Sequence, residues 1–166
     1  HLQEWINEAQ FGEKFAHHPK LGAAEYKSVH HCENGRTVYS FCMCPGGYVV
    51  AAASEEGKVV TNGMSYADRD GENANAALLV TVNPADFPYE GTLGGMKWQR
   101  EIEEKAYAVS GSYRAPAQLV GDFLAGKAST GEGNVHPTYC PGVIWCDLHQ
   151  VLPERITNSI AEALPK

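Results

Sequence analysis

The sequence predicts an α+β fold: an antiparallel β meander, with helices mainly in the C-terminal half of the chain. Between residues 26 and 82 apolar and polar residues tend to alternate, whereas after residue 96 apolar residues recur at helical spacing. The strand-like runs are joined by short connections, and parallel neighbours would need a crossover of a dozen or more residues. Strands and helices do not alternate along the chain, so we expect the two kinds of element to be segregated.

The strand-rich half, residues 26–82, follows a short opening helix that Phe11-Gly12 ends. The first two expected strands flank Asn34-Gly35, which is a strong hairpin signal. A polar stretch over residues 62–75 is expected to form a long ordered loop, and such loops tend to carry function. The five expected strands are Tyr26–Cys32, Thr37–Met43, Tyr48–Ala53, Lys58–Thr61 and Ala76–Val82.

The helix-rich half covers residues 96–164. Trp98, Ile102 and Ala106 share one face of the first expected helix, with acidic and basic residues largely outside. Gly126 is suited to end the second helix, and Pro153 is suited to the first position of the last one. The expected helical segments are Met96–Val109, Pro116–Ala125, Val143–Val151 and Pro153–Leu164.

Composition limits the possible partners. A chain of 166 residues with 43% apolar content is expected to form one domain. Its 20 acidic and 13 basic residues give a net charge of −7, which argues against nucleic-acid binding because that needs clustered Lys and Arg. The longest apolar runs are far shorter than the roughly 20 residues that span a bilayer. We therefore expect neither nucleic acid nor membrane as a partner.

The five cysteines lack the paired spacing of a disulfide framework, which favours a reducing cytoplasm. Cys42-x-Cys44 and Cys140-x5-Cys146 do not have the spacing of structural zinc sites, and no metal site is expected. Of the neighbours His30 and His31, at most one can face a given site, because adjacent strand residues point to opposite sides.

The most informative segment is the Cys-Pro-Gly-Gly bend at residues 44–47, which joins two apolar runs. Gly46 and Gly47 serve a tight turn, and small residues there would also let a flat ligand approach the backbone. Cys42 and Cys44 are two apart and are expected on the same face of a strand. Packing under the hairpin and a redox dithiol are both compatible with them, and packing is favoured because no neighbouring cation would lower a thiol pKa.

The polar loop after the fourth expected strand contains Arg69 between two aspartates. Its guanidinium could bind a carboxylate, or the aspartates could simply neutralise it. Asn and Asp side chains in such loops also commonly bond their own backbone. No dinucleotide fingerprint, Walker loop, nucleophile elbow or metalloprotease motif occurs in the chain, so most of any dinucleotide site must lie elsewhere.

Several segments carry a family resemblance. The chain resembles the bacterial FAD-dependent dehydrogenases described as NAD-utilizing, and the resemblance runs over nearly its whole length. The matching segments are Gly35–Val50, Val60–Ser65, Arg69–Asn75, Ala115–Leu124 and Pro141–Val143.

The resemblance implies that this chain is the inserted, substrate-side domain of a larger flavoprotein, with a Rossmann-like FAD domain split around it. The chain starts at His1 rather than Met, which also suggests a piece of a longer protein. Its partners would be the FAD-binding domain of the same parent chain and a small-molecule substrate, with NAD(P) as a further candidate electron donor or acceptor. The whole would be a cytoplasmic oxidoreductase, and this domain would not be catalytic alone.

We expect the bend and the stretch after the fourth strand to face the flavin ring in the intact protein. Two residues of the polar loop, Arg69 and Asn73, are expected to contact substrate. A different function remains open: a free-standing small-molecule binding module, or a thiol enzyme that uses Cys42, Cys44 and a histidine. The expected cofactor-side residues are Cys42, Cys44, Pro45, Gly46, Gly47, Asn62, Gly63, Met64 and Ser65.

Overall fold

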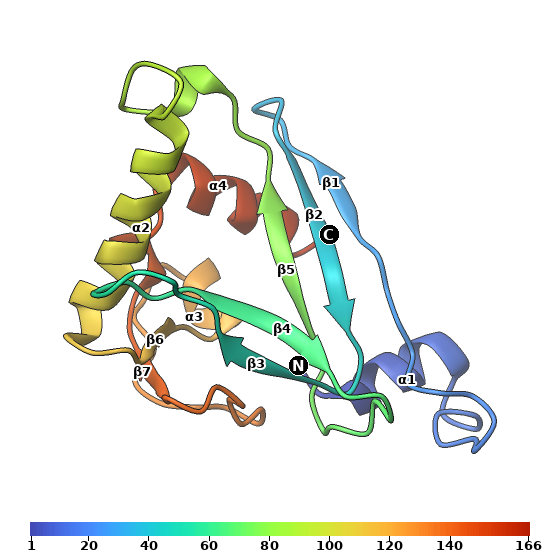
Figure 1. Cartoon of the computed structure of the whole chain (residues 1–166). Helices are drawn as coiled ribbons and strands as arrows, with labels where there is room; N and C mark the ends of the chain where they lie inside the picture. Colours follow the sequence, from blue (N-terminus) through green and yellow to red (C-terminus); the bar gives the residue numbers. More distant parts are fainter.

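Short strands and four α-helices make up the computed structural model, which describes all 166 residues and has the predicted α+β composition (Figure 1). The strands form an antiparallel sheet in the order β1-β2-β5, a β3-β4 hairpin and a parallel β6-β7 pair. The strands are β1 (Val29–His31), β2 (Thr37–Cys44), β3 (Gly47–Ala51), β4 (Thr61–Ser65), β5 (Asn75–Val80), β6 (Ala115–Ala117) and β7 (Val143–Trp145).

The helices lie at the N-terminus, in the middle and at the C-terminus, so they are not mainly C-terminal. Two 3-10 turns accompany them. The set is α1 (Gln3–Phe11), η1 (Pro84–Asp86), α2 (Gly94–Ser110), α3 (Val120–Leu124), η2 (Leu148–Gln150) and α4 (Glu154–Ala163). No helix is both long and apolar enough to cross a bilayer.

The predicted hairpin around Asn34-Gly35 is confirmed. β1 and β2 pair antiparallel with His31 opposite Thr37, and Gly35 has a φ of 79° that favours glycine. The Gly35 N–H donates to the Cys32 carbonyl over 2.9 Å and closes the turn.

The predicted continuous meander is wrong, because the chain leaves the sheet at the bend after β2. The Gly47 N–H donates to the Asn73 carbonyl over 2.6 Å, and the Gly46 N–H donates to Oε1 of Gln3 over 2.8 Å. These bonds turn β3 away, and β5 pairs with β2 instead. Two small antiparallel sheets therefore replace one.

The fourth strand runs over Thr61–Ser65 rather than 58–61, so residues 62–65 are not in a loop. The residues before this strand contact α2. The Lys58 ammonium pairs with Glu55 at 2.6 Å and Glu104 at 3.2 Å. The Val59 N–H donates to the Glu103 carbonyl over 3.2 Å.

Helices α2 and α4 confirm two of the four predicted C-terminal segments. The helix predicted at 116–125 is confirmed only over α3, and the helix predicted at 143–151 is wrong over most of its length, because β6 and β7 pair in parallel with Pro116 opposite Ile144. Only α3 and the short turn η2 remain helical in these two segments.

The small core lies under α2, where the buried cluster Val59, Ala106, Ala115, Tyr139 and Val151 joins α2 to β6 and to the η2 region. Helix α4 packs on β2 and β5. It lies behind the β1-β2-β5 sheet in Figure 1, and no helix lies in front of that sheet.

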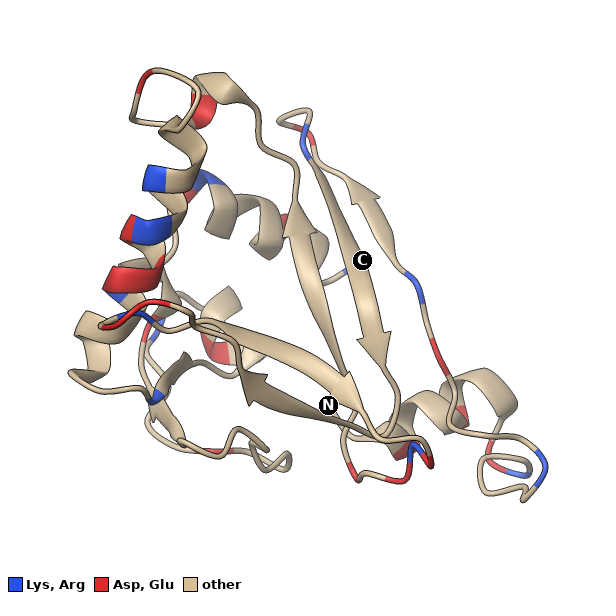
Figure 2. Cartoon of the chain, viewed as in Figure 1, with Lys and Arg blue, Asp and Glu red and all other residues tan.

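None of the seven strands contains an Asp, Glu, Lys or Arg residue, and in Figure 2 their arrows are entirely tan. By register, one face of the main sheet carries five residues that we call the open sheet face. Val29 and Phe41 on this face are 65% and 53% exposed. The open sheet face consists of Val29, Tyr39, Phe41, Ala77 and Leu79.

Candidate functional site

The Cys-Pro-Gly-Gly bend is enclosed by the protein itself. Pro45, Gly46 and Gly47 are all buried. A Cβ on Gly47 would lie 2.6 Å from the Cys44 carbonyl oxygen and 2.8 Å from that of Met64. Glycine is required here because the chain's own backbone approaches so closely. The bend thus has a structural role within the chain, and a ligand contact at its glycines stays a prediction.

The two cysteines near the bend do not follow the simple alternation of a strand. The register between β2 and β5 shifts between Phe41 and Cys44, which is a β-bulge, and Cys42 has a φ of 44°. Cys42 is exposed and Cys44 half-buried, with the Cys44 thiol donating to the Cys42 carbonyl over 3.2 Å. Neither thiol has a histidine or a cation as a hydrogen-bond or ion-pair partner. All five cysteines are free.

Strand β4 splits the predicted stretch 62–65 into two faces. Asn62 and Met64 are exposed on the outer face. On the inner face, Gly63 lies against Asn75, and the Ser65 hydroxyl donates to the Pro45 carbonyl over 2.7 Å. The outer pair is therefore more accessible to a ligand or a partner than the half-buried inner pair.

Two tyrosines that the sequence analysis missed lie beside this outer pair. Tyr48 is opposite Met64 in the β3-β4 register, and Tyr48 and Tyr66 pack edge to face with their ring centroids 5.3 Å apart. Tyr66 is 62% exposed. The sequence signal for Tyr66 is its spacing, because Asn62, Met64 and Tyr66 are each two residues apart and would share one face of a strand. We call Tyr48, Asn62, Met64 and Tyr66 the hairpin face.

The two predicted substrate residues lie in different surroundings. Arg69 is exposed, has a φ of 50°, and binds the carboxylate of Glu25 at 2.6 Å rather than either neighbouring aspartate. Asn73 is buried, and its amide donates to the His136 carbonyl over 2.8 Å, whereas its Oδ1 has no partner. It lines a cavity of about 180 Å³ with His1, whose buried Nε2 also lacks a partner. Two such polar atoms suit an ordered water.

The predicted residues therefore do not form one open pocket. An apolar groove of about 780 Å³ lies instead on the α2 side of the molecule. It is lined mainly by hydrophobic residues, including Val59, Phe87, Trp98, Ile102 and Leu152. The helical spacing of Trp98 and Ile102 had predicted a packed face, but the structure leaves it open on one side.

The chain has more accessible surface than a self-contained domain. Only 22 of its 166 residues are buried, and its surface is 10277 Å². A compact monomer of this length is expected to have roughly 8,000 Å². Fifteen large hydrophobic residues are exposed, which is typical of a surface that another part of a protein covers.

A protein family described as "FAD-dependent protein, C-terminal domain-like" matches residues 1–166. The chain belongs to this family. It is also 49% identical over 166 residues to a protein from Clostridium beijerinckii described only as uncharacterized. That match covers 99% of the chain but 31% of the relative, so the chain spans about a third of the length of the curated relative.

Membership of the FAD-dependent C-terminal domain family confirms the coarser part of the resemblance, namely a domain of a larger FAD-dependent protein. The position of this domain as an insertion within a split FAD domain stays a prediction. The residues of this chain do not fit the pyrophosphate of FAD. The glycines of the bend face their own backbone, and no glycine-rich fingerprint precedes a helix.

Proposed function

We propose that this chain is the substrate-side domain that covers the flavin in an FAD-dependent oxidoreductase, whose FAD-binding part lies elsewhere in the same parent chain. The observation that carries the proposal is the uncharged, exposed sheet surface together with the large accessible area. Strands exposed to water normally carry charges that prevent pairing with other chains. A partner domain that covers these strands explains why they need none here.

The open sheet face is the surface that we assign to this contact. Val29 and Phe41 are among the most exposed apolar residues of the chain. No helix covers this face, whereas α4 covers the opposite one (Figure 1). The relative is about three times as long as this chain, which supplies enough additional sequence for an FAD-binding domain as the occupant.

Of the predicted cofactor side, a flavin could reach Cys42 and the two residues of the hairpin face, Asn62 and Met64. Asn62 offers an amide and Met64 an adaptable thioether, and such groups can tune and cover a flavin ring. The other predicted residues would support Asn62 and Met64 from beneath. They are Cys44, Pro45, Gly46, Gly47, Gly63 and Ser65. The chain supplies no FAD-binding cradle of its own in this proposal.

The finer activity is a dehydrogenase reaction between FAD and an organic substrate, with NAD(P) as a candidate donor or acceptor. Arg69 would contact an acidic substrate by exchanging its exposed partner Glu25 for the substrate carboxylate. Asn73 would contact the substrate from the small cavity that it lines with His1. This proposal assigns no catalytic acid or base.

The proposal is tested in the full-length protein with Asn62→Ala and Met64→Ala, singly and together. We expect the flavin spectrum to shift and the reduction rate to fall roughly tenfold, about 1.4 kcal/mol of barrier. Asn158→Ala and Met96→Ala are matched controls, because both residues are exposed on helices. A double variant with unchanged flavin content, spectrum and reduction rate would contradict the placement of the hairpin face.

A further inference from the structure

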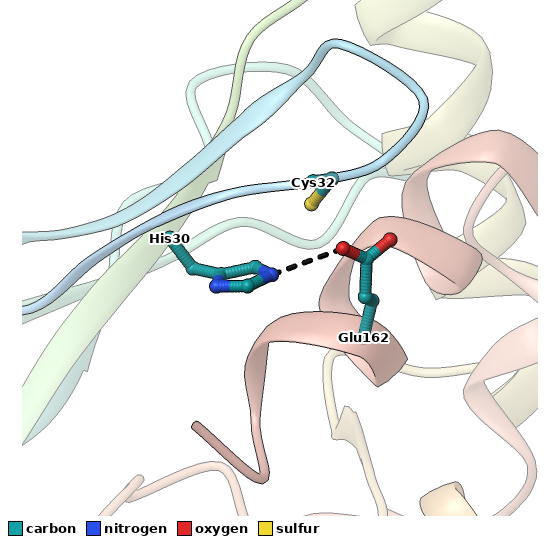
Figure 3. Close-up of side chains that lie close together, drawn as sticks. All are labelled: His30, Cys32 and Glu162. Atoms are coloured by element: carbon teal, nitrogen blue, oxygen red, sulfur yellow. Dashed lines mark hydrogen bonds and ion pairs between the residues drawn. The ribbon is translucent and has the colours of Figure 1, made fainter.

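Three side chains with metal-binding atoms meet where the first hairpin touches α4 (Figure 3). His30 lies on β1, Cys32 follows directly after it, and Glu162 lies near the end of α4. The possible ligand atoms of the three all lie within 4.8 Å of one another. Nε2 of His30 is 3.0 Å from Oε1 of Glu162.

The local structure explains why these residues converge. Residues two apart on a strand point to the same side, so His30 and Cys32 both face α4. The neighbouring His31 has a separate partner, because its Nδ1 lies 3.0 Å from the Thr37 hydroxyl. The pattern His30-x-Cys32 was therefore a usable signal, but its third member is 130 residues away in the sequence.

Further contacts fix the hairpin to α4 and hold the cluster in place. The Glu33 N–H donates to Oε1 of Glu162 over 2.9 Å, and the Asn34 amide donates to the hydroxyl of the fully buried Ser159 over 3.0 Å. The Cys32 thiol donates weakly to the Ser159 carbonyl over 3.6 Å. Such outer contacts orient ligands before a metal arrives.

The cluster is shielded on one side and reachable from the other. Cys32 is only 6% exposed, whereas the side chains of His30 and Glu162 are 25% and 30% exposed. His30 also lines a groove of about 800 Å³ between the sheet and the end of α4. A small ligand could therefore reach the cluster from the groove.

A thiol nucleophile is not favoured here. Burial, and then the nearby Glu162 carboxylate, raise the pKa of the Cys32 thiol. Nucleophilic thiols need the opposite shift, which a neighbouring cation usually provides. A bound metal ion would itself be such a cation.

We propose that His30, Cys32 and Glu162 bind one divalent transition-metal ion of the zinc class, with a fourth coordination position open toward the groove. Imidazole nitrogen, thiolate sulfur and carboxylate oxygen are the ligands that zinc uses in proteins. A tetrahedral site needs ligand atoms about 3.3 to 3.6 Å apart, which small side-chain rotations can reach. The thiolate favours zinc over magnesium or calcium.

The charges balance when the metal binds. The Cys32 thiol releases its proton to solvent as the metal–sulfur bond forms, and Glu162 binds as a carboxylate. These two anions neutralise the dication, while His30 binds as the neutral imidazole. The direct contact between His30 and Glu162 is then replaced by their bonds to the shared ion.

The competing explanation is a structural pair, in which His30 and Glu162 merely fasten the hairpin to α4 and Cys32 fills the core. The test uses the full-length protein, stripped with a chelator and titrated with Zn²⁺ against a competing metal indicator. Zinc-edge X-ray absorption then identifies the ligands. We expect tight zinc binding with one sulfur neighbour at about 2.3 Å and lighter neighbours at about 2.0 Å.

Substitutions assign the site within the full-length protein. Cys32→Ser should remove the sulfur neighbour, and His30→Gln and Glu162→Gln should each weaken Zn²⁺ binding at least about 100-fold. The matched controls His31→Gln, Glu33→Gln and Cys140→Ser should bind Zn²⁺ as the parent does. Zn²⁺ should raise the Tm of the parent and of the controls. In the three ligand variants, the part of this Tm increase that comes from the site should be lost.

The proposal is overturned if the stripped protein binds no Zn²⁺ with sulfur coordination. It is also overturned if the sulfur neighbour survives Cys32→Ser, or if the controls lose as much affinity as the ligand variants. Because His30 and Glu162 are partly exposed, their variants provide a result even if Cys32→Ser fails to fold.

Discussion

Asp86 accepts two parallel hydrogen bonds from the guanidinium of Arg36, at 2.6 and 2.8 Å. The Asp86 side chain is only 7% exposed, and Arg155 of α4 also binds it at 2.9 Å. Its other oxygen accepts from the Asn83 N–H and caps η1. One carboxylate therefore joins the start of β2, the end of the strand-rich half and α4.

We predict that Asp86→Asn destabilises the protein by roughly 2 kcal/mol, because two guanidinium groups lose a charged partner. Urea unfolding followed by circular dichroism measures the change. Asp68→Asn, in an exposed loop, is the matched control and should change the free energy of unfolding by less than about 0.5 kcal/mol. If the two variants have the same free energy of unfolding, the claim that Asp86 joins these three elements is contradicted.

The same carboxylate predicts a pH dependence. Hydrogen bonds from Arg36, and then from the Asn83 backbone, hold the pKa of Asp86 well below its usual range. An Asp with a lowered folded pKa contributes stability above its unfolded pKa of about 3.9 and loses it as pH falls through the folded value. The stability difference between parent and Asp86→Asn should be constant near neutral pH and shrink below about pH 4. A difference that stays constant into strong acid would contradict the lowered pKa.

Gly47→Ala is predicted to be destabilising by about 1 to 3 kcal/mol, because the added methyl group would meet two carbonyl oxygens of its own chain. The control is Gly121→Ala in α3, where nothing lies within 4 Å of the added carbon. That control should be neutral or slightly stabilising. Thermal unfolding of both variants measures the difference. A Tm of Gly47→Ala as high as that of Gly121→Ala would contradict the enclosed bend.

Side-chain footprinting can test the contact assigned to the open sheet face. In the full-length protein, Val29 and Phe41 should be labelled several-fold less than in the isolated chain, because the FAD-binding part covers them. Leu124 and Met96 are exposed on helices and should be labelled equally in both. Strong labelling of Phe41 in the full-length protein would show that this face stays open to water.

Thiol alkylation of the native protein should follow exposure. Cys42 and Cys140 are exposed and should react first, whereas Cys32 is buried and its raised pKa leaves little thiolate at neutral pH. Mass spectrometry of timed samples gives the order. Rapid modification of Cys32 without loss of structure would contradict the buried hairpin contact.

Sequence patterns predicted the elements that depend on local residues. The helical spacing of Trp98 and Ile102 gave α2, and Asn34-Gly35 gave the first hairpin. Longer-range choices could not be predicted in this way. Whether β2 pairs with β3 or β5 depends on hydrogen bonds from Gly46 and Gly47 to distant residues, and the parallel β6-β7 pair is made of strands only three residues long.

The candidate sites show the same limit. Alternation along β4 could have separated Asn62 and Met64 from Gly63 and Ser65, had the strand been located correctly. The bulge at Cys42 leaves no mark that spacing can detect. Nothing in the sequence near His30 indicates Glu162, because only the packing of α4 on the sheet brings them together.

The absence of formal charge from every strand has a consequence for biosynthesis. If an FAD-binding domain covers the sheet as proposed, a newly made copy of this chain exposes strands without charged residues, and these could pair with other chains until that domain docks. Expression of this chain without the rest of its parent protein should therefore give inclusion bodies more readily than a split at other boundaries. In this proposal, linkage in one polypeptide would keep the covering domain close to these strands as they fold.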